Sequence, residues 1–282
     1  MKISRKANQL IRTFEAALAP GGNPHPRAPL YAGVDLGTAY IVTAVVDGHG
    51  LPVAGVVTNS RASIRDGLIL DYVGAVSILR TQVQMLHEAG FPIRTAAAAY
   101  PPGTTGRNAQ TFGNVLEAVG LKAAGLVDEP SAAALVLDIT DGAVVDIGGG
   151  TTGISVLEKG QVIFTADEAT GGIHLDLVLA GHYRIDVRES ERIKTDPARQ
   201  ADVFPLVRPV FEKMASIVNR YLKGFNVETL YLVGGTSCFP GIEAVMEAET
   251  GLTVARPCNP LLVTPLGIAL SCLKMAGNEG AV

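Results

Sequence analysis

The chain has 282 residues, enough for two compact domains, and 48% of them are hydrophobic. A formal charge of −4 excludes a global electrostatic attraction to nucleic acid or anionic membranes. Cys238, Cys258 and Cys272 have no metal-ligand spacing, and their odd number excludes complete disulfide pairing. With no secretory signal and no apolar run near the ~20 residues of a membrane span, we expect a soluble, cytoplasmic protein with reduced thiols.

Residues 1–19 are predicted to form an amphipathic helix, because apolar residues recur at helical spacing while the basic residues lie mostly off that stripe. The stripe consists of Ile3, Ala7, Leu10, Ile11, Phe14 and Leu18. The next segment, 20–29, is rich in proline and glycine and is predicted to be a linker. We therefore expect the helix to be tethered to the body and not built into it.

The remaining chain alternates apolar strands with amphipathic helices, which is typical of an α/β fold. Asp71 is the expected N-cap of the first long helix. Strands are predicted at 31–36, 40–46, 51–57, 95–100, 143–147, 154–157, 162–166 and 229–233. Helices are predicted at 105–119, 206–223, 241–249 and 265–276, besides the one that begins at Asp71.

One short sequence motif occurs twice, as Val34-Asp35-Leu36-Gly37 and as Val145-Asp146-Ile147-Gly148. Each copy ends a Val-rich strand and enters a β-meander. A single Asp-x-Gly turn is common in ordinary tight turns, but two copies in the same context indicate internal repetition. The repeat predicts two related domains of roughly a hundred residues each.

The two turns have the composition of a phosphate clamp. Glycines let backbone N–H groups approach phosphate oxygens, and threonine hydroxyls add donors. The candidates are Gly37, Thr38, Gly148, Gly149, Gly150 and Thr151. Carboxylates beside phosphates need an intervening hard cation, so Asp35 and Asp146 are the candidate Mg²⁺ residues. The alternative is that both aspartates only cap their turns.

Two further segments complete the candidate site. Glu129, before Pro130, stands at the expected mouth of a helix and could orient an attacking water, although it could equally serve only the helix dipole. Gly234, Gly235 and Thr236 follow a strand and precede a helix, an arrangement that lets a backbone pack against a nucleoside. A Gly-Gly turn alone would be an ordinary turn.

The ordered motifs GVDLGT, DEPSAAAL, VVDIGGGTT and LVGGTSCFPG are similar to those of the actin, Hsp70 and sugar-kinase superfamily, especially its Hsp70-like and MreB-like members. The resemblance covers residues 31 to about 276. It implies an actin-like ATPase fold: two duplicated ribonuclease-H-like α/β domains with reduced insertion subdomains and a nucleotide cleft between them. The implied division is 1–29 (helix and linker), 30–141 with 262–282 (first domain) and 142–261 (second domain).

The same resemblance implies ATP or ADP with Mg²⁺ as ligands. Gly171 and Gly172, in ATGG, and Glu191 with Lys194, in SERIK, resemble the family residues that approach the nucleoside. The glutamate and the lysine could instead be solvated residues of one helix. The stretch 65–71 looks like the segment before the first long helix of MreB-like proteins.

More narrowly, GGGTTGIS, ADEATGG and the N-terminal extension resemble the ethanolamine-utilisation members of the superfamily, which are described as chaperone-like. The implied partner is an ethanolamine-pathway enzyme or a microcompartment shell protein, and the implied location is within or at a bacterial microcompartment. Helix 1–19 then resembles an encapsulation peptide; a docked surface helix and a lipid-binding helix remain alternatives.

Several positions depart from the superfamily pattern. Gly153 stands where Hsp70 relatives carry a second acidic residue, Cys238 stands where they carry an adenine-stacking arginine, and 195–203 is too short for the second insertion subdomain. These departures predict a weak ATPase at most. Three functions are open: a nucleotide-gated partner protein, a small-molecule kinase with Asp146 as base, or a non-catalytic adaptor. The histidines are not clustered, and no metal beyond Mg²⁺ is expected.

Overall fold

A computed structural model of the chain describes residues 2–18, 27–60, 64–65, 68–101, 104 and 106–279. Some predictions fall outside the described residues: most of the linker at 20–29, part of the 65–71 stretch, and the Pro-Gly end of the strand at 95–100. The predicted strands and helices otherwise appear where the patterns place them, with boundaries that differ by up to four residues except at the start of the helix predicted at 206–223, which lies six residues earlier.

The first sheet has the strand order β3-β2-β1-β6-β7. Its strands are β1 (Tyr31–Leu36), β2 (Tyr40–Val46), β3 (Pro52–Asn59), β6 (Thr95–Tyr100) and β7 (Lys122–Asp128). β1, β2 and β3 form an antiparallel meander, whereas β6 and β7 run parallel to β1. A small separate hairpin consists of β4 (Ile64–Arg65) and β5 (Leu68–Ile69).

The second sheet repeats this order as β10-β9-β8-β11-β12. Its strands are β8 (Gly142–Ile147), β9 (Thr152–Glu158), β10 (Gln161–Glu168), β11 (Thr229–Val233) and β12 (Thr253–Ala255). The first three are again antiparallel and the last two are parallel to β8. The predicted duplication is therefore confirmed at the level of strand order and direction, while the domain boundaries stay a prediction.

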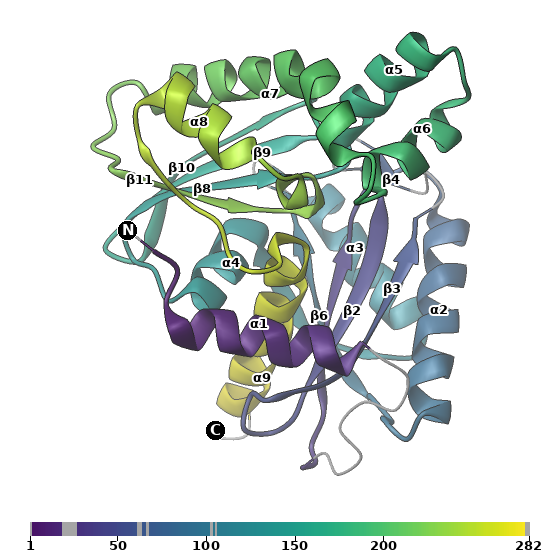
Figure 1. The fold of residues 1–282 in the computed structure, drawn as a ribbon. Helices are drawn as coiled ribbons and strands as arrows, with labels where there is room; N and C mark the ends of the chain where they lie inside the picture. The colour runs from purple at the N-terminus through teal and green to yellow at the C-terminus, as the bar shows by residue number, and fades with distance from the viewer. Residues whose placement is uncertain are drawn as a thin grey trace.

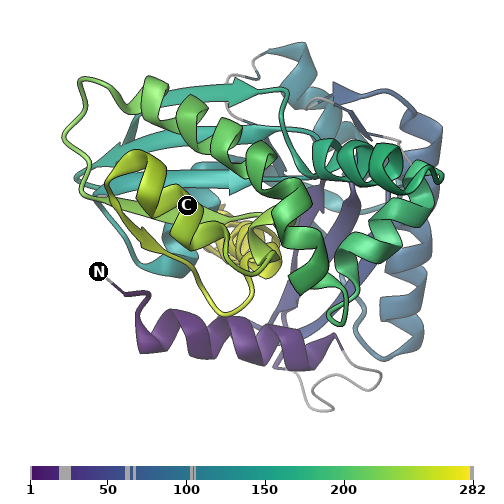
Figure 2. The same cartoon turned by 45° about the horizontal axis from the view of Figure 1, so that its top comes forward.

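Two equivalent helices, each following the last strand of a sheet, form the layer between the sheets. They are α4 (Glu129–Leu137) and α9 (Val263–Glu279), the latter preceded by the short η2 (Pro260–Leu262). Figure 2 shows α9 nearly end on in the middle of the molecule. The two helices approach so closely that a Cβ at Gly267 would overlap the backbone of Ala132. Their contacts join the halves of the molecule.

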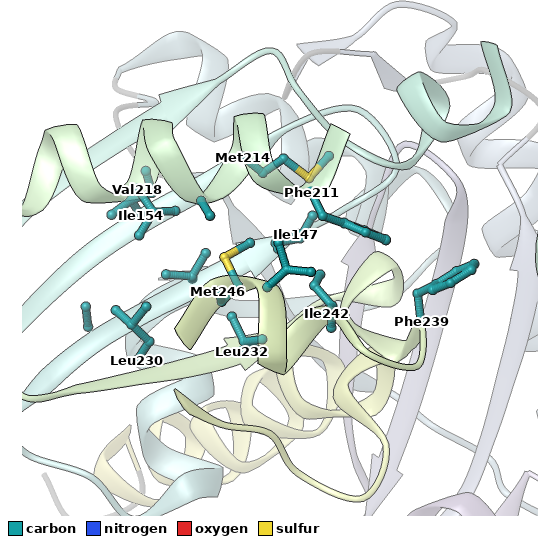
Figure 3. Packing of buried hydrophobic residues seen from close by; sticks show 14 of the residues in the cluster. Ile147, Ile154, Phe211, Met214, Val218, Leu230, Leu232, Phe239, Ile242 and Met246 are labelled. Carbon is teal, nitrogen blue, oxygen red and sulfur yellow. The ribbon is translucent and has the colours of Figure 1, made fainter. Parts of the chain in front are cut away.

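The other helices cover the outer faces of the sheets (Figure 1). The first sheet carries α2 (Tyr72–Glu88) and α3 (Arg107–Ala118), and Asp71 caps α2 as predicted, accepting a hydrogen bond from Gly74 N at 2.8 Å. The second carries α5 (Gly172–Tyr183), α6 (Val187–Thr195), α7 (Gln200–Leu222) and α8 (Ile242–Thr250), with η1 (Gly235–Cys238) before α8. Figure 3 shows Phe211 and Met214 of α7 packed over Ile147 and Leu232 of this sheet.

The N-terminal helix α1 (Arg5–Ala17) corrects an expectation. Its amphipathic pattern is confirmed, but the prediction that it is not built into the body is wrong, because Ile11 and Phe14 are completely buried. Phe14 packs against β3, where a Cβ at Gly55 would lie 2.5 Å from its ring. Asn8 Oδ1 also accepts a hydrogen bond from Cys258 N at 2.8 Å. The helix contacts elements of both halves, and its basic face points to solvent.

A second correction concerns hydropathy. One segment, Pro260–Gly277, is long and apolar enough to cross a membrane by length and composition, although we expected no such run. It corresponds to η2 and most of α9, and 61% of it is buried inside the protein. Its apolarity is explained by this position, because α9 packs against α4 and the first sheet.

Candidate functional site

The two repeated turns meet at the carboxyl ends of β1 and β8, where they face each other across the two halves. A Cβ at Gly149 would lie 2.8 Å from the Cβ of Ala39, and a Cβ at Gly150 would lie 3.0 Å from Thr38 Oγ1. Gly37 N and Gly148 N each donate a hydrogen bond within their own turn, to Tyr40 O and Thr151 O, both at 3.0 Å. Only small residues fit this approach, as the glycine-rich sequences suggested.

Three carboxylates lie at the base of these turns: Asp35 at the end of β1, Asp146 at the end of β8, and Glu129 at the start of α4. Burial, and then the charge of Asp146, raises the pKa of Asp35 to about 7. The pKa of Glu129 lies well above its ordinary value, mainly because the group is buried and then because of the charges of Asp146, Asp35, Asp167 and Asp128. The structure thus concentrates negative charge in a poorly hydrated place.

Asp146 has a hydrogen-bond donor that was not predicted from the sequence, and the backbone of Gly234 packs closely against it. Burial raises its pKa to about 6, although a hydrogen bond from Thr264, whose Oγ1 donates to Asp146 Oδ2 at 3.1 Å, opposes the shift. Thr264 is 118 residues away in the chain, so no local pattern could have indicated it. On its other side, Gly234 adopts φ 87°, and a Cβ there would overlap Asp146 Oδ1.

Glu129 occupies the first turn of α4 as predicted, followed by Pro130. Asp128, which the sequence analysis did not identify, is the N-cap and accepts a hydrogen bond from Ser131 N at 2.9 Å. Capping is therefore done by Asp128. Because a neighbouring side chain satisfies the helix end, the Glu129 carboxylate is not needed for that task and lies beside Asp35 and Asp146.

The glycines predicted for the nucleoside lie against the second turn. A Cβ at Gly171 would lie 2.6 Å from the backbone of Gly150, and one at Gly172 would lie 2.6 Å from Thr236 Oγ1. Thr236 Oγ1 donates a hydrogen bond to Gly148 O at 2.7 Å. Segments from three separate parts of the chain thereby assemble around one turn, and Gly234-Gly235-Thr236 is one of them, as expected.

Lys194 also lies here, but it is engaged within the protein. Its Nζ is 2.8 Å from Asp176 Oδ2 and donates a longer hydrogen bond of 3.4 Å to Gly172 O. The lysine side chain is 15% exposed and that of Asp176 6%, so the ion pair is largely buried. Of the two predicted nucleoside residues, Lys194 is thus anchored next to Gly172 by an aspartate that we had not identified.

Glu191 is partly exposed on the same helix, α6. Burial, followed by the charges of Glu191 and Asp176, raises the pKa of Tyr40, which begins β2 in the first half. Tyr40 is therefore close to the Gly172–Lys194 region and extends the site across both halves. Tyr40 was predicted only as a strand residue, because nothing local distinguishes it from a buried aromatic.

Gly153 carries no acidic side chain, but an acidic residue lies beside it on the neighbouring strand. Gly153 is paired with Asp146 on one side and with Asp167 of β10 on the other. The charge of Asp167 contributes to the raised pKa values of both Asp146 and Glu129. An acidic group therefore reaches this part of the site from the next strand.

These residues fit a magnesium nucleotide by their chemistry. The small-residue turns bring two stretches of backbone close together, and the carboxylates are destabilised by burial and mutual repulsion, which a cation would relieve. Within the part of the chain that the structure describes, no three His, Cys, Asp or Glu side chains could hold a metal ion by themselves. Mg²⁺ would therefore need water and phosphate oxygens as further ligands, as it usually does.

Comparisons with known proteins agree with the fold and narrow the family. The MreB/Mbl protein family matches residues 56–196, and the type IV pilus assembly protein PilM family matches residues 138–264. MreB5 of Spiroplasma citri, solved bound to AMPPNP, superposes with a TM-score of 0.73 at 16% identity, covering 91% of this chain and all of that one. The fold is thus the actin-like ATPase fold.

Much greater similarity links the chain to ethanolamine utilization protein EutJ. The Salmonella typhimurium protein is 44% identical over 245 residues, which are 86% of each chain. The crystal structure of EutJ from Carboxydothermus hydrogenoformans superposes with a TM-score of 0.88 at 47% identity and covers 94% of this chain and 97% of that chain. The chain belongs to the EutJ family of ethanolamine utilization proteins.

Proposed function

We propose that this protein binds Mg-ATP and Mg-ADP between its two glycine turns and acts as a nucleotide-gated, chaperone-like factor for ethanolamine utilisation. Its client would be a pathway enzyme or a microcompartment shell protein, which it would reactivate or help to assemble. The observation that carries the proposal is the convergence of Asp35, Asp146 and Glu129 beneath two turns of small residues.

Each group would have a distinct task. Gly37, Thr38 and the 148–151 turn would hold the phosphates, while Asp35 and Asp146 would hold Mg²⁺ through water. Bound Mg²⁺ would neutralise phosphate charge. Gly171, Gly172, Gly234, Gly235 and Thr236 would contact the nucleoside, with Glu191 and Lys194 at its edge. Glu129 would accept a hydrogen bond from the attacking water and so orient it.

Gating follows from the position of the site between the two halves. A ligand that contacts both turns stabilises one relative arrangement of the halves, and loss of a phosphate changes that preference. Slow turnover suits this role, because each nucleotide state then persists long enough for a partner to bind. The AMPPNP complex of the related fold in MreB5 supports nucleotide binding.

The test is calorimetry with Mg-ATP and Mg-ADP on the full chain, together with phosphate release. We expect binding of both nucleotides, loss of binding in Asp35→Asn/Asp146→Asn, and retained binding without turnover in Glu129→Gln. Exposed Asp202→Asn is the matched control. An empty cleft at millimolar Mg-ATP and Mg-ADP, in solution and in soaked crystals, would overturn the proposal.

A non-catalytic adaptor is the second candidate, and Gly153 is the observation that favours it. The position opposite Asp146 lacks a side chain, so only the exposed Asp167 supplies an acidic group there. An adaptor would bind nucleotide without hydrolysing it. Measurable turnover that Glu129→Gln abolishes would exclude this candidate.

A further inference from the structure

A groove lies at the end of the second sheet that is farthest from the glycine turns. β8 and β11 begin there, at Gly142 and Thr229, whereas the candidate nucleotide site is at their carboxyl ends. The length of β8 puts roughly 17 Å between the two ends. The groove is therefore separate from the nucleotide site, although the same strands form part of both.

The groove consists of two neighbouring cavities with volumes of about 470 and 250 Å³, and Asp138, Ile139 and Leu157 line both of them. Its lining is of mixed polarity, and several apolar side chains contribute to it. They include Ile163, which is 48% exposed, together with partly buried Phe225 and Leu135. A cavity of this size accommodates several side chains of a peptide, and its apolar surface gains free energy when a partner covers it.

The charge around the groove has one sign. No Lys or Arg occurs among the described residues that line the groove. Four carboxylates line it: Asp138, Asp141, Glu158 and Glu228. All four are exposed. A hydrogen bond from the backbone of Lys159, and then one from Thr140, lowers the pKa of Asp141, so this carboxylate is ionised near neutral pH. Lys159 itself lies beside the groove and offsets only part of the charge.

We infer that this groove is the docking site for a short basic and apolar segment of a partner protein. Apolar side chains of the segment fill the groove over Leu135, Ile163 and Phe225, and its lysines or arginines face the carboxylate rim. The opposite charges guide encounter and fix orientation, and the apolar side chains that the segment covers add to the affinity.

The walls of the groove belong to different parts of the fold. Ser131, Ala134 and Leu135 come from α4, which packs against the first sheet through Ala132, whereas Leu157, Ile163 and Phe225 belong to the second half. The chain passes from one half to the other along the groove itself, between Asp138 and Gly142. Rotation of the halves would change its width. This part of the inference rests on the proposed nucleotide gating, and coupling would act in both directions.

The experiment uses two labelled 12-residue peptides, one of alternating leucine and lysine clusters and one with glutamate in place of lysine, and fluorescence anisotropy at physiological salt. We expect the leucine–lysine peptide to bind the full-length protein at least tenfold more tightly than its acidic counterpart. The variants Glu158→Lys/Glu228→Lys and Ile163→Ser should each weaken binding at least tenfold.

The control variant Glu117→Lys/Glu249→Lys makes the same charge change on the exposed surfaces of α3 and α8. Its affinity for the leucine–lysine peptide should remain within twofold of the wild-type affinity. Groove variants that bind like this control, or peptides that bind equally, would overturn the inference. Saturating Mg-AMPPNP and Mg-ADP should give peptide affinities that differ at least threefold. Equal affinities would refute gating but leave the groove intact, whereas calorimetry without peptide tests nucleotide binding by itself.

Discussion

The duplicated halves place equivalent residues of α4 and α9 at the same site with different chemistry. Each helix follows the last strand of its sheet and has a proline in its first turn, Pro130 in α4 and Pro265 in α9. The residue before the proline is Glu129 in one case and Thr264 in the other. Glu129 adds a carboxylate beside Asp35, whereas Thr264 donates a hydrogen bond to Asp146.

This difference makes the site chemically asymmetric although the scaffold is duplicated. Asp146 has a hydroxyl donor and a pKa raised to about 6, while the charge of Asp146 adds to burial in raising the pKa of Asp35 to about 7. In the second half, Gly171, Gly172 and Thr236 also lie against the glycine turn that begins at Gly148. We therefore expect the second half to hold most of the nucleotide, and the first half to respond to its charge.

The contact between α4 and α9 is where a substitution should have the largest effect. Gly267→Ala places a methyl group into the backbone of Ala132, and we expect the free energy of unfolding to fall by about 3 kcal/mol or more. Chemical denaturation measures this. Gly277→Ala, on the same helix with no described atom within 4 Å of the new methyl, should be neutral or stabilising by about 0.5–1 kcal/mol. Equal effects would contradict the close packing.

The ion pair that exists only in the second half should have the next largest effect. Lys194→Met leaves Asp176 charged and largely buried, and we expect a loss of about 2–3 kcal/mol in the free energy of unfolding. The double variant Asp176→Asn/Lys194→Met removes the orphaned charge and should recover at least half of that loss. If the double variant is less stable than the single one, the two side chains are not coupled as the structure indicates.

Removing a carboxylate from the first half should stabilise the ligand-free protein. Because the pKa of Asp35 is raised on folding, the native state keeps its proton to higher pH, and stability is lost as pH rises from about 4 to about 7. Asp35→Asn should therefore be more stable than wild type by about 1–3 kcal/mol at pH 8 and equally stable near pH 4. Thermal unfolding across this range measures the difference.

The same substitution in the second half sharpens the comparison. Asp146→Asn should stabilise by less than Asp35→Asn, since the pKa of Asp146 is raised less. A larger gain in Asp146→Asn would show that the two halves are not arranged as described.

The smallest effect is expected at Thr264. Thr264→Val keeps the shape but removes the donor to Asp146, so the pKa of Asp146 should rise further and stability at pH 8 should fall by about 1 kcal/mol. Thr264→Ser retains the hydroxyl and should keep the wild-type pH dependence. An identical pH profile in all three proteins would mean that the hydrogen bond does not influence the carboxylate.

Much of this architecture could be predicted from the sequence. Strands 31–36, 40–46, 95–100 and 229–233 were located to the residue, because Val-rich or Ala-rich runs ended at Gly, Pro or Asp. Helix α7 begins at Gln200, six residues earlier than expected, and continues through Pro205 and Pro209. The strands β7 and β12 were missed because they are short of branched residues or only three residues long.

Some residues of the candidate site could be predicted from the sequence and others could not. Residues in glycine-rich motifs were found, since their composition is itself the requirement for close approach to phosphate. Thr264, Asp176 and Asp167 were missed because each acts through a partner on another strand or helix. The docking of α1 was only one of several open alternatives: the linker suggested separation, whereas the complementary surface for Phe14 is formed by β3 and cannot be recognised in the helix sequence.

The crowded carboxylates have a calorimetric consequence. At pH 6–7, Asp35 and Asp146 are partly protonated in the ligand-free protein. Binding of a magnesium nucleotide that lowers their pKa values must expel those protons into the buffer. The observed binding enthalpy should then vary linearly with the ionisation enthalpy of the buffer, and the slope should shrink as the pH approaches 8. Heat measured in phosphate and in Tris would thus count the protons that the empty cleft holds.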